Sequence, residues 1–158
     1  MDIKIDSNEG KFKFRVCGIL KHQNKYLIVK INNNKFYCLP GGHVELDEDT
    51  DFAVLREMKE ELNFEVKIKK LIAINQNFFK TENNLPFHEL GFYYIVEAKN
   101  ENDIIFEDYS RDELDKGIIQ HLDFKWCTLE ELKNIDFKPD FIVDTLQNDN
   151  FVLKTTRD

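Results

Sequence analysis

The stretch GHVELDEDTDFAVLREMKEELNF, from Gly42 to Phe64, decides the fold, because it joins a short loop to a helix that is rich in carboxylates. Thr50 or Asp49 can cap the amino end of this helix, which we expect to run to about Leu62. Asn63 follows, and asparagine tolerates the left-handed backbone conformation that ends many helices. The stretch therefore predicts a loop, a helix and a sharp exit from it.

An apolar stripe attaches the predicted helix to the rest of the protein. Leu55, Met58 and Leu62 recur at i, i+3 and i+7, which is the spacing of residues on one helix face. Such a stripe must face a core. Because successive residues turn by about 100°, the carboxylates lie roughly opposite the stripe, and we expect their face to be free to hold a metal.

Three glutamates share that second face. Glu57, Glu60 and Glu61 are spaced at i, i+3 and i+4, and their repulsion destabilises a helix by roughly a few tenths of a kcal/mol per pair. A hard divalent cation with oxygen ligands reverses the sign of this effect. The alternative is a solvated acidic face that pairs with neighbouring basic residues. Glu48 and a Gly-Gly turn, in fixed register upstream, favour the metal interpretation.

The pattern Gly-x5-Glu-x7-Arg-Glu-apolar-x-Glu-Glu, from Gly42 to Glu61, resembles the Nudix box. This box is the signature of hydrolases that cleave nucleoside diphosphates linked to another moiety. Every charged position is filled, and the one departure is Asn63, which stands where the family usually has Gly. The resemblance implies a Nudix-like α/β/α sandwich with a central mixed β-sheet. It also implies that the box forms a loop-helix-loop within a single domain that spans residues 1–158.

The resemblance implies a metal site as well. The ligands of Mg²⁺ or Mn²⁺ would be the side chains of Glu57, Glu60 and Glu61 and the backbone carbonyl of Gly41. Gly42 would permit a backbone path that a Cβ would obstruct.

Catalytic roles follow from the same resemblance and include Glu60, Glu61, Arg56 and Glu48. Arg56 would orient the carboxylates of the box, because a guanidinium offers a rigid bidentate fork. Glu48 would lie near the metals, as an outer group or a further ligand. Glu60 or Glu61 would be the general base unless metal occupies both. The alternative is a base from a later loop, with three candidates: Glu107, Asp112 and Glu113.

Substrate contacts are less sharply marked. His88 and Glu89 precede a long strand and could place a donor and an acceptor beside the metals, and Arg15 could reach a phosphate or a base. A histidine at a strand edge is more often structural, and an arginine on a strand more often forms a surface ion pair. His43 lies in the box loop, and several aromatic residues could stack on a base. These aromatic residues are Phe78, Phe79, Phe87, Tyr93 and Tyr94.

The remaining pattern predicts strands around the central helix. We expect strands at 11–20, 26–30, 36–39, 66–79, 90–98 and 121–126. Short helices are expected at 128–132 and from Pro139 to about 147. Residues 1–10 are polar, so we expect them to be flexible. Residues 100–117 read as mostly loop, with a turn of helix near 111–114.

Composition bounds the function. The chain has 158 residues, a formal net charge of −8 and a hydrophobic content of 42%, which suit one globular domain. The negative charge argues against non-specific binding of nucleic-acid backbone. Three widely spaced cysteines without a C-x-x-C motif suggest reduced thiols. No run is apolar and long enough for a membrane span, so we expect a cytoplasmic protein that does not bind membranes.

The resulting hypothesis is a metal-dependent pyrophosphohydrolase that acts on a small nucleotide-type diphosphate. A nucleoside triphosphate, for instance an oxidised purine nucleotide, is our first expectation, and ADP-ribose or a nucleotide sugar is the second. Two rivals remain. A nucleotide sensor would normally have lost box carboxylates, and an RNA 5′-end pyrophosphohydrolase would want a basic patch. The resemblance also leaves a homodimer open.

Overall fold

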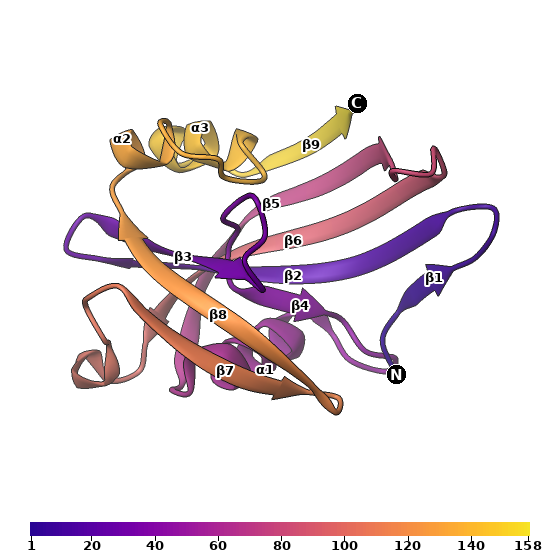
Figure 1. Cartoon of the computed structure of the whole chain (residues 1–158). Coiled ribbons are helices and arrows are strands. Elements are labelled where there is room, and N and C mark those ends of the chain that lie inside the picture. Colours follow the sequence, from indigo (N-terminus) through magenta and orange to yellow (C-terminus); the bar gives the residue numbers. More distant parts are fainter.

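A central sheet with helices on both faces makes up the fold (Figure 1). The computed structural model describes residues 1–158. The strands are β1 (Lys4–Asp6), β2 (Lys11–His22), β3 (Lys25–Ile31), β4 (Gly41–His43), β5 (Val66–Lys80), β6 (Pro86–Ala98), β7 (Tyr109–Asp115), β8 (Ile118–Cys127) and β9 (Val152–Arg157). The helices are α1 (Thr50–Leu62), α2 (Leu129–Leu132) and α3 (Phe141–Asn148), with a 3-10 turn at Glu101–Asp103.

The strand order is β7-β8-β3-β2-β6-β5-β9, with β1 and β4 also paired to β2. Most pairs are antiparallel, but β2–β6 and β5–β9 are parallel, so the sheet is mixed. β2 and β3 share only two residue pairs, next to their connecting turn. The β3–β8–β7 part therefore diverges from the β2–β6–β5–β9 part, and β7 and β8 cross in front of α1 (Figure 1).

Two hydrophobic clusters hold the layers together. One joins α1 to both parts of the sheet, and the other places α2 and α3 against the opposite face. The expected mixed α/β sandwich is therefore confirmed. None of the three helices has the length and apolar character that crossing a membrane requires.

α1 begins and ends where the sequence indicates. Asp49 is the N-cap, and its carboxylate accepts a hydrogen bond from the backbone N–H of Phe52 at 2.8 Å. Asn63 ends the helix at φ 63°, so the exit that glycine usually provides is kept. The buried stripe, however, is Val54, Met58 and Leu62, and Leu55 is only partly buried.

The acidic face of α1 is not opposite the core, which corrects the expectation from helix geometry. Glu61 is only 4% exposed, whereas the side chain of Glu60 is 45% exposed. On a helical wheel Glu61 lies about 20° from Val54, because seven residues make almost two full turns. The three glutamates therefore extend from the edge of the core to solvent, and Glu61 is desolvated by its position.

Three other expectations need correction, and β9 is an element for which the sequence provides no expectation. Residues 109–115 form β7, and not a loop with a turn of helix near 111–114. The segment at 36–39 makes only isolated bridges, through Tyr37 and Cys38. The N-terminal segment, which we expected to be flexible, contributes β1 to a pairing with β2.

Candidate functional site

A cavity of 610 Å³ lies between α1, β2, β4 and the β7–β8 hairpin. One wall is acidic and consists of Glu57, Glu60 and Glu61 of α1, with Glu113 of β7 beside them. The facing β2 contributes two cations, Lys13 and Arg15. The structure thus places the three glutamates of the helix around one space, and Lys13 and Arg15 add positive charge to it.

Arg56 organises the loop and the helix of the box. Its Nε and Nη2 donate to the two carboxylate oxygens of Glu48 at 2.8 and 2.9 Å, a bidentate pairing. Nη1 donates to Glu57 at 2.9 Å, and Nη2 donates to the carbonyl of His43 at 3.0 Å. Glu60 is more distant, at 3.4 Å from Nη1. Arg56 therefore orients the carboxylates, and its hydrogen bond lowers the pKa of Glu48, which lies behind it and outside the cavity lining.

Glu61 and Glu57 are the least solvated carboxylates of the site. Burial raises the pKa of Glu61 well above its usual value, and the neighbouring Glu57 raises it further. Burial likewise raises the pKa of Glu57 to about 7. Glu61 accepts a hydrogen bond from the Gly41 N–H at 3.3 Å. A Cβ on Gly42 would come within 2.5 Å of the Glu57 carboxylate, so a side chain there would displace Glu57; close approach, and not a positive φ, favours glycine.

The donor set suits a hard divalent cation. No three acidic, histidine or cysteine side chains of the chain converge closely enough to hold an ion as they stand. The side chains are nevertheless oxygen donors, two of them are desolvated, and like charges raise the pKa of Glu61. A cation would relieve that repulsion, as Mg²⁺ does with a few carboxylates and water. Glu57, Glu60 and Glu61, with Gly41 beside them, are therefore the residues that would hold it.

The β7–β8 hairpin closes one side of the cavity. Arg111 donates to the backbone carbonyls of Glu60, at 3.0 Å, and Glu61, which ties β7 to the carboxyl end of α1. At the hairpin turn, Lys116 forms an ion pair with Asp2. These contacts fix the hairpin at both of its ends.

Among the three later-loop candidates for a base, only Glu113 lines the cavity. It is 9% exposed, and burial raises its pKa. Asp112 points to the other face of β7, where its carboxylate lies 2.8 Å from Nδ1 of His121. Glu107 is exposed and outside the cavity. Because neighbouring strand residues point to opposite faces, Glu113 lines the cavity and Asp112 does not. The sequence does not reveal this alternation, because the segment is mostly polar.

The basic wall contains the two buried side-chain polar atoms that lack a hydrogen-bond partner. These are Nε of Arg15 and Nε2 of His43, whose residues are direct cross-strand partners on β2 and β4. Burial lowers the pKa of His43 to about 4, so this ring is neutral near pH 7. Lys13, one strand repeat from Arg15, was missed in the sequence. The alternation Lys11, Lys13, Arg15 is the signal that could have found it.

A second cavity, of 410 Å³, opens behind Arg15, which lines both spaces. Glu89 of β6, Asn77 of β5 and the rings of Phe79 and Tyr93 also line this second cavity. Arg15 and Glu89, two of the predicted substrate contacts, are therefore brought together. Tyr94 is not part of the group, because its hydroxyl bonds to Thr50 and Asp51 beside the start of α1.

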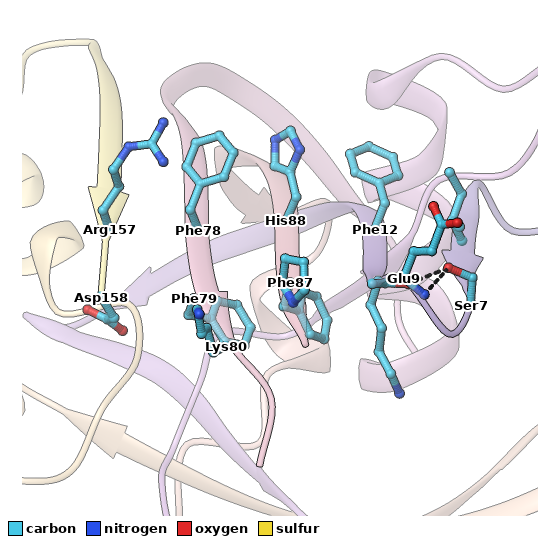
Figure 2. Close-up of a pocket in the computed structure, with 14 residues that line it drawn as sticks. Ser7, Glu9, Phe12, Phe78, Phe79, Lys80, Phe87, His88, Arg157 and Asp158 are labelled. Atoms are coloured by element: carbon cyan, nitrogen blue, oxygen red, sulfur yellow. Dashed lines mark hydrogen bonds between the residues drawn. The ribbon is translucent and has the colours of Figure 1, made fainter. Parts of the chain in front are cut away.

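His88 does not join them. Adjacent strand residues point to opposite faces, and His88 lies in a hollow of 490 Å³ at the far end of the sheet (Figure 2). There it stacks on Phe78 at 4.3 Å and meets the edge of Phe12 at 5.2 Å, in a row that ends at Arg157 (Figure 2). Phe79 and Phe87 stack on each other at 4.4 Å on the other side of their strands. The expectation that His88 contacts substrate beside the glutamates is therefore wrong, because His88 lines a different hollow.

The model of the NUDIX domain matches residues 12–145, most of the chain. The chain belongs to the NUDIX domain family. An ADP-ribose pyrophosphatase of Methanocaldococcus jannaschii is 44% identical over 62 residues, which cover 37% of each protein. The match thus spans about a third of that relative.

Solved structures agree on the Nudix fold. A NUDIX hydrolase from Nitrosomonas europaea superposes with a TM-score of 0.61 at 18% identity, covering 92% of this chain and 79% of that one. A UDP-X diphosphatase gives 0.62 at 14% identity, covering 94% and 69%. At such identities the likeness shows the fold alone. Residues of the Nudix box line the 610 Å³ cavity, which is therefore the candidate active site.

Proposed function

We propose that this protein hydrolyses the diphosphate bond of a small nucleotide-type molecule with the help of Mg²⁺ or Mn²⁺. The observation that carries the proposal is the cavity in which the glutamates of the Nudix box face Lys13 and Arg15. A diphosphate needs positive charge on both sides, and a metal on the acidic wall together with the two cations would supply it. The membership of the family supports the same reaction class.

Several residues of the cavity have separate roles in the proposed hydrolysis. When bound, a divalent ion would offset the charge of the phosphates and lower the pKa of a water molecule. Lys13 and Arg15 bind phosphate oxygens, and Arg56 keeps the glutamates in place through Glu48 and Glu57. Glu113 takes the proton from the attacking water, because it lines the cavity without being in the helix that would hold the metal.

Two substrate classes come first. A nucleoside triphosphate is the class we propose, and ADP-ribose or a nucleotide sugar is the alternative, which the name of the Methanocaldococcus relative supports. The three free cysteines fit a reducing compartment, and this supports our proposal of the cytoplasm.

The test is product release with Mg²⁺ from a panel of substrates. The panel contains nucleoside triphosphates, canonical and oxidised, ADP-ribose, nucleotide sugars, dinucleoside polyphosphates and 5′-triphosphorylated RNA. Glu60→Gln should lower turnover of the preferred substrate by at least about 10–100-fold, because losing a metal ligand costs no less than losing a residue that merely supports one. Glu65→Gln is the matched control, since this exposed residue follows the helix without lining the cavity.

Excess chelator should silence the wild-type protein, and Mg²⁺ or Mn²⁺ should restore it. Full activity in chelator would refute the metal role, and unchanged turnover in Glu60→Gln would remove the box from the reaction. No product from any member of the panel, by a folded protein that binds metal, would favour a nucleotide sensor.

A further inference from the structure

Arg15 lies at the junction of the two cavities. Its side chain lines both the carboxylate cavity and the second cavity, and its Nε is buried without a hydrogen-bond partner. Glu89 acts on it only through space, without a hydrogen bond. The residue as a whole is only partly buried, so it is this one N–H that has given up water, and leaving it unpaired costs folding free energy unless a ligand satisfies it. The junction therefore presents an unpaired hydrogen-bond donor between two cavities.

The lining of the second cavity combines aromatic side chains with charged and polar ones. Its volume of 410 Å³ is in the range of small-molecule pockets. Phe79 and Tyr93 provide aromatic surface, and Glu89 provides a carboxylate next to Arg15, in addition to those of Asp140 and Asp158. Glu89 directly faces Lys13 across β2 and β6, yet no salt bridge joins them. Its oxygens are thus available to a ligand.

We propose that the second cavity binds the base of the nucleotide substrate, and that Glu89 selects a base with two adjacent N–H donors, the pattern of guanine. The inference rests on the proposed function in one respect, since it takes the substrate to be a nucleotide. The inference adds the identity of the nucleobase and of the residue that binds it.

The selectivity follows from the donors that each base presents. An ionised carboxylate only accepts hydrogen bonds. Guanine presents N1–H and the 2-amino group side by side, so both oxygens of a carboxylate find a donor. Adenine presents its 6-amino group next to the N1 acceptor, and the acceptor repels the second oxygen. Uracil places its single N–H between two carbonyls, which is worse for the same reason.

Arg15 contributes affinity without this selectivity. From the junction its guanidinium can donate to the phosphate that continues into the carboxylate cavity, where Lys13 adds a second cation. Every nucleotide carries that phosphate. Arg15 should therefore strengthen the binding of all nucleotides alike, whereas Glu89 should discriminate between them.

The experiment is calorimetric titration of the whole protein with GMP, IMP and AMP in the presence of chelator. Wild type should bind GMP about 5- to 150-fold more tightly than AMP, the range that one bidentate base contact gives. IMP keeps N1–H but lacks the 2-amino group, so it should lie between them. Glu89→Gln should bring the GMP-to-AMP ratio close to one.

Two further variants separate the roles. Glu97→Gln, on the same strand but paired with Lys67 and outside the second cavity, should leave the ratio unchanged. Arg15→Met should weaken GMP and AMP by the same factor and leave the binding of guanosine, which has no phosphate, unaffected. A melting curve for each variant verifies that it is folded.

The outcomes separate this inference from the proposed function, because the titration needs neither metal nor turnover. Equal binding of GMP and AMP, a ratio that survives Glu89→Gln, or no binding in the millimolar range would each overturn the inference. Hydrolysis of the panel without base preference would leave the proposed function standing alone. Selective binding of GMP by a protein that hydrolyses nothing would support the base selectivity and overturn the proposed hydrolysis.

Discussion

At the scale of single residues, Arg15 shows a conflict between stability and binding. Its buried Nε has no partner, so the folded protein carries a desolvated donor that the unfolded chain would hydrate. Arg111 is the opposite case, because it donates to two carbonyls at the end of α1. We therefore expect the two arginines to contribute to the free energy of folding with opposite signs.

We expect Arg15→Met to raise the free energy of unfolding by about 1–3 kcal/mol, the usual cost of one unsatisfied buried polar group. Methionine keeps most of the apolar volume and is adaptable. Urea unfolding without ligand measures the change. Arg111→Met is the control and should lower the same quantity, since it leaves two helix carbonyls unpaired. A loss of stability in Arg15→Met that equals the loss in Arg111→Met would contradict the assignment.

The sequence is sufficient to find the residues of the box, because their register is local to one loop and one helix. It does not reveal that Glu61 is buried, since that depends on what covers the helix. It also groups His88 with Glu89, which the strand then separates onto opposite faces. Arg15 and Lys13 are recognisable as one face of a strand, but their place opposite the glutamates depends on the pairing of β2 with β4.

At the scale of elements, the β7–β8 hairpin decides which later carboxylate reaches the cavity. Its segment reads as a loop because its inward positions are mostly polar, so the apolar alternation that marks a strand is absent. β9 escapes prediction for a similar reason, as an exposed strand with two leading apolar residues. α1 and the capping box of α2, in contrast, follow from local signals and are found as expected.

Because neighbouring residues of β7 point to opposite faces, two adjacent substitutions test whether Glu113 is the general base. Glu113→Gln should lower kcat by about 10²–10⁴-fold, the contribution of a general base, with little change in melting temperature. Asp112→Asn is the matched control, because the neighbouring carboxylate faces His121 on the other side of the strand. Rates under saturating substrate measure both. Equal losses in the two variants would point to a disturbed hairpin, and unchanged kcat in Glu113→Gln would return the role to Glu60 or Glu61.

At the scale of the whole molecule, the divergence of β2 and β3 creates the site. The two strands separate after two residue pairs, and α1 packs against both parts of the sheet. Acidic and basic walls therefore come from elements that meet only in the folded chain. The net charge of −8 describes the surface as a whole and says nothing of this local arrangement. Composition alone argues against non-specific nucleic-acid binding but could not locate the cations.

The same arrangement couples metal binding to the stability of the fold. Without a cation, burial and mutual repulsion disfavour the charged forms of Glu57 and Glu61, so the folded state is penalised near neutral pH. A divalent ion held by these carboxylates in the folded protein would bind the unfolded chain far less well. Added Mg²⁺ should therefore raise the free energy of unfolding by about 2.7 kcal/mol at a hundred times its Kd. For a chain of this size each kcal/mol corresponds to about 2–4 °C in Tm.

Calorimetric melting with increasing Mg²⁺, at constant ionic strength, measures this coupling. Ca²⁺ serves as a comparison, because it prefers more ligands at longer distances and should shift Tm by a different amount. Glu60→Gln should flatten the dependence on Mg²⁺, whereas Glu65→Gln should retain it. A Tm that is independent of Mg²⁺ in the wild type would mean that the glutamates do not hold a cation in the free protein. The metal would then have to arrive with the phosphates of the substrate, and the melting shift should appear only when both are present.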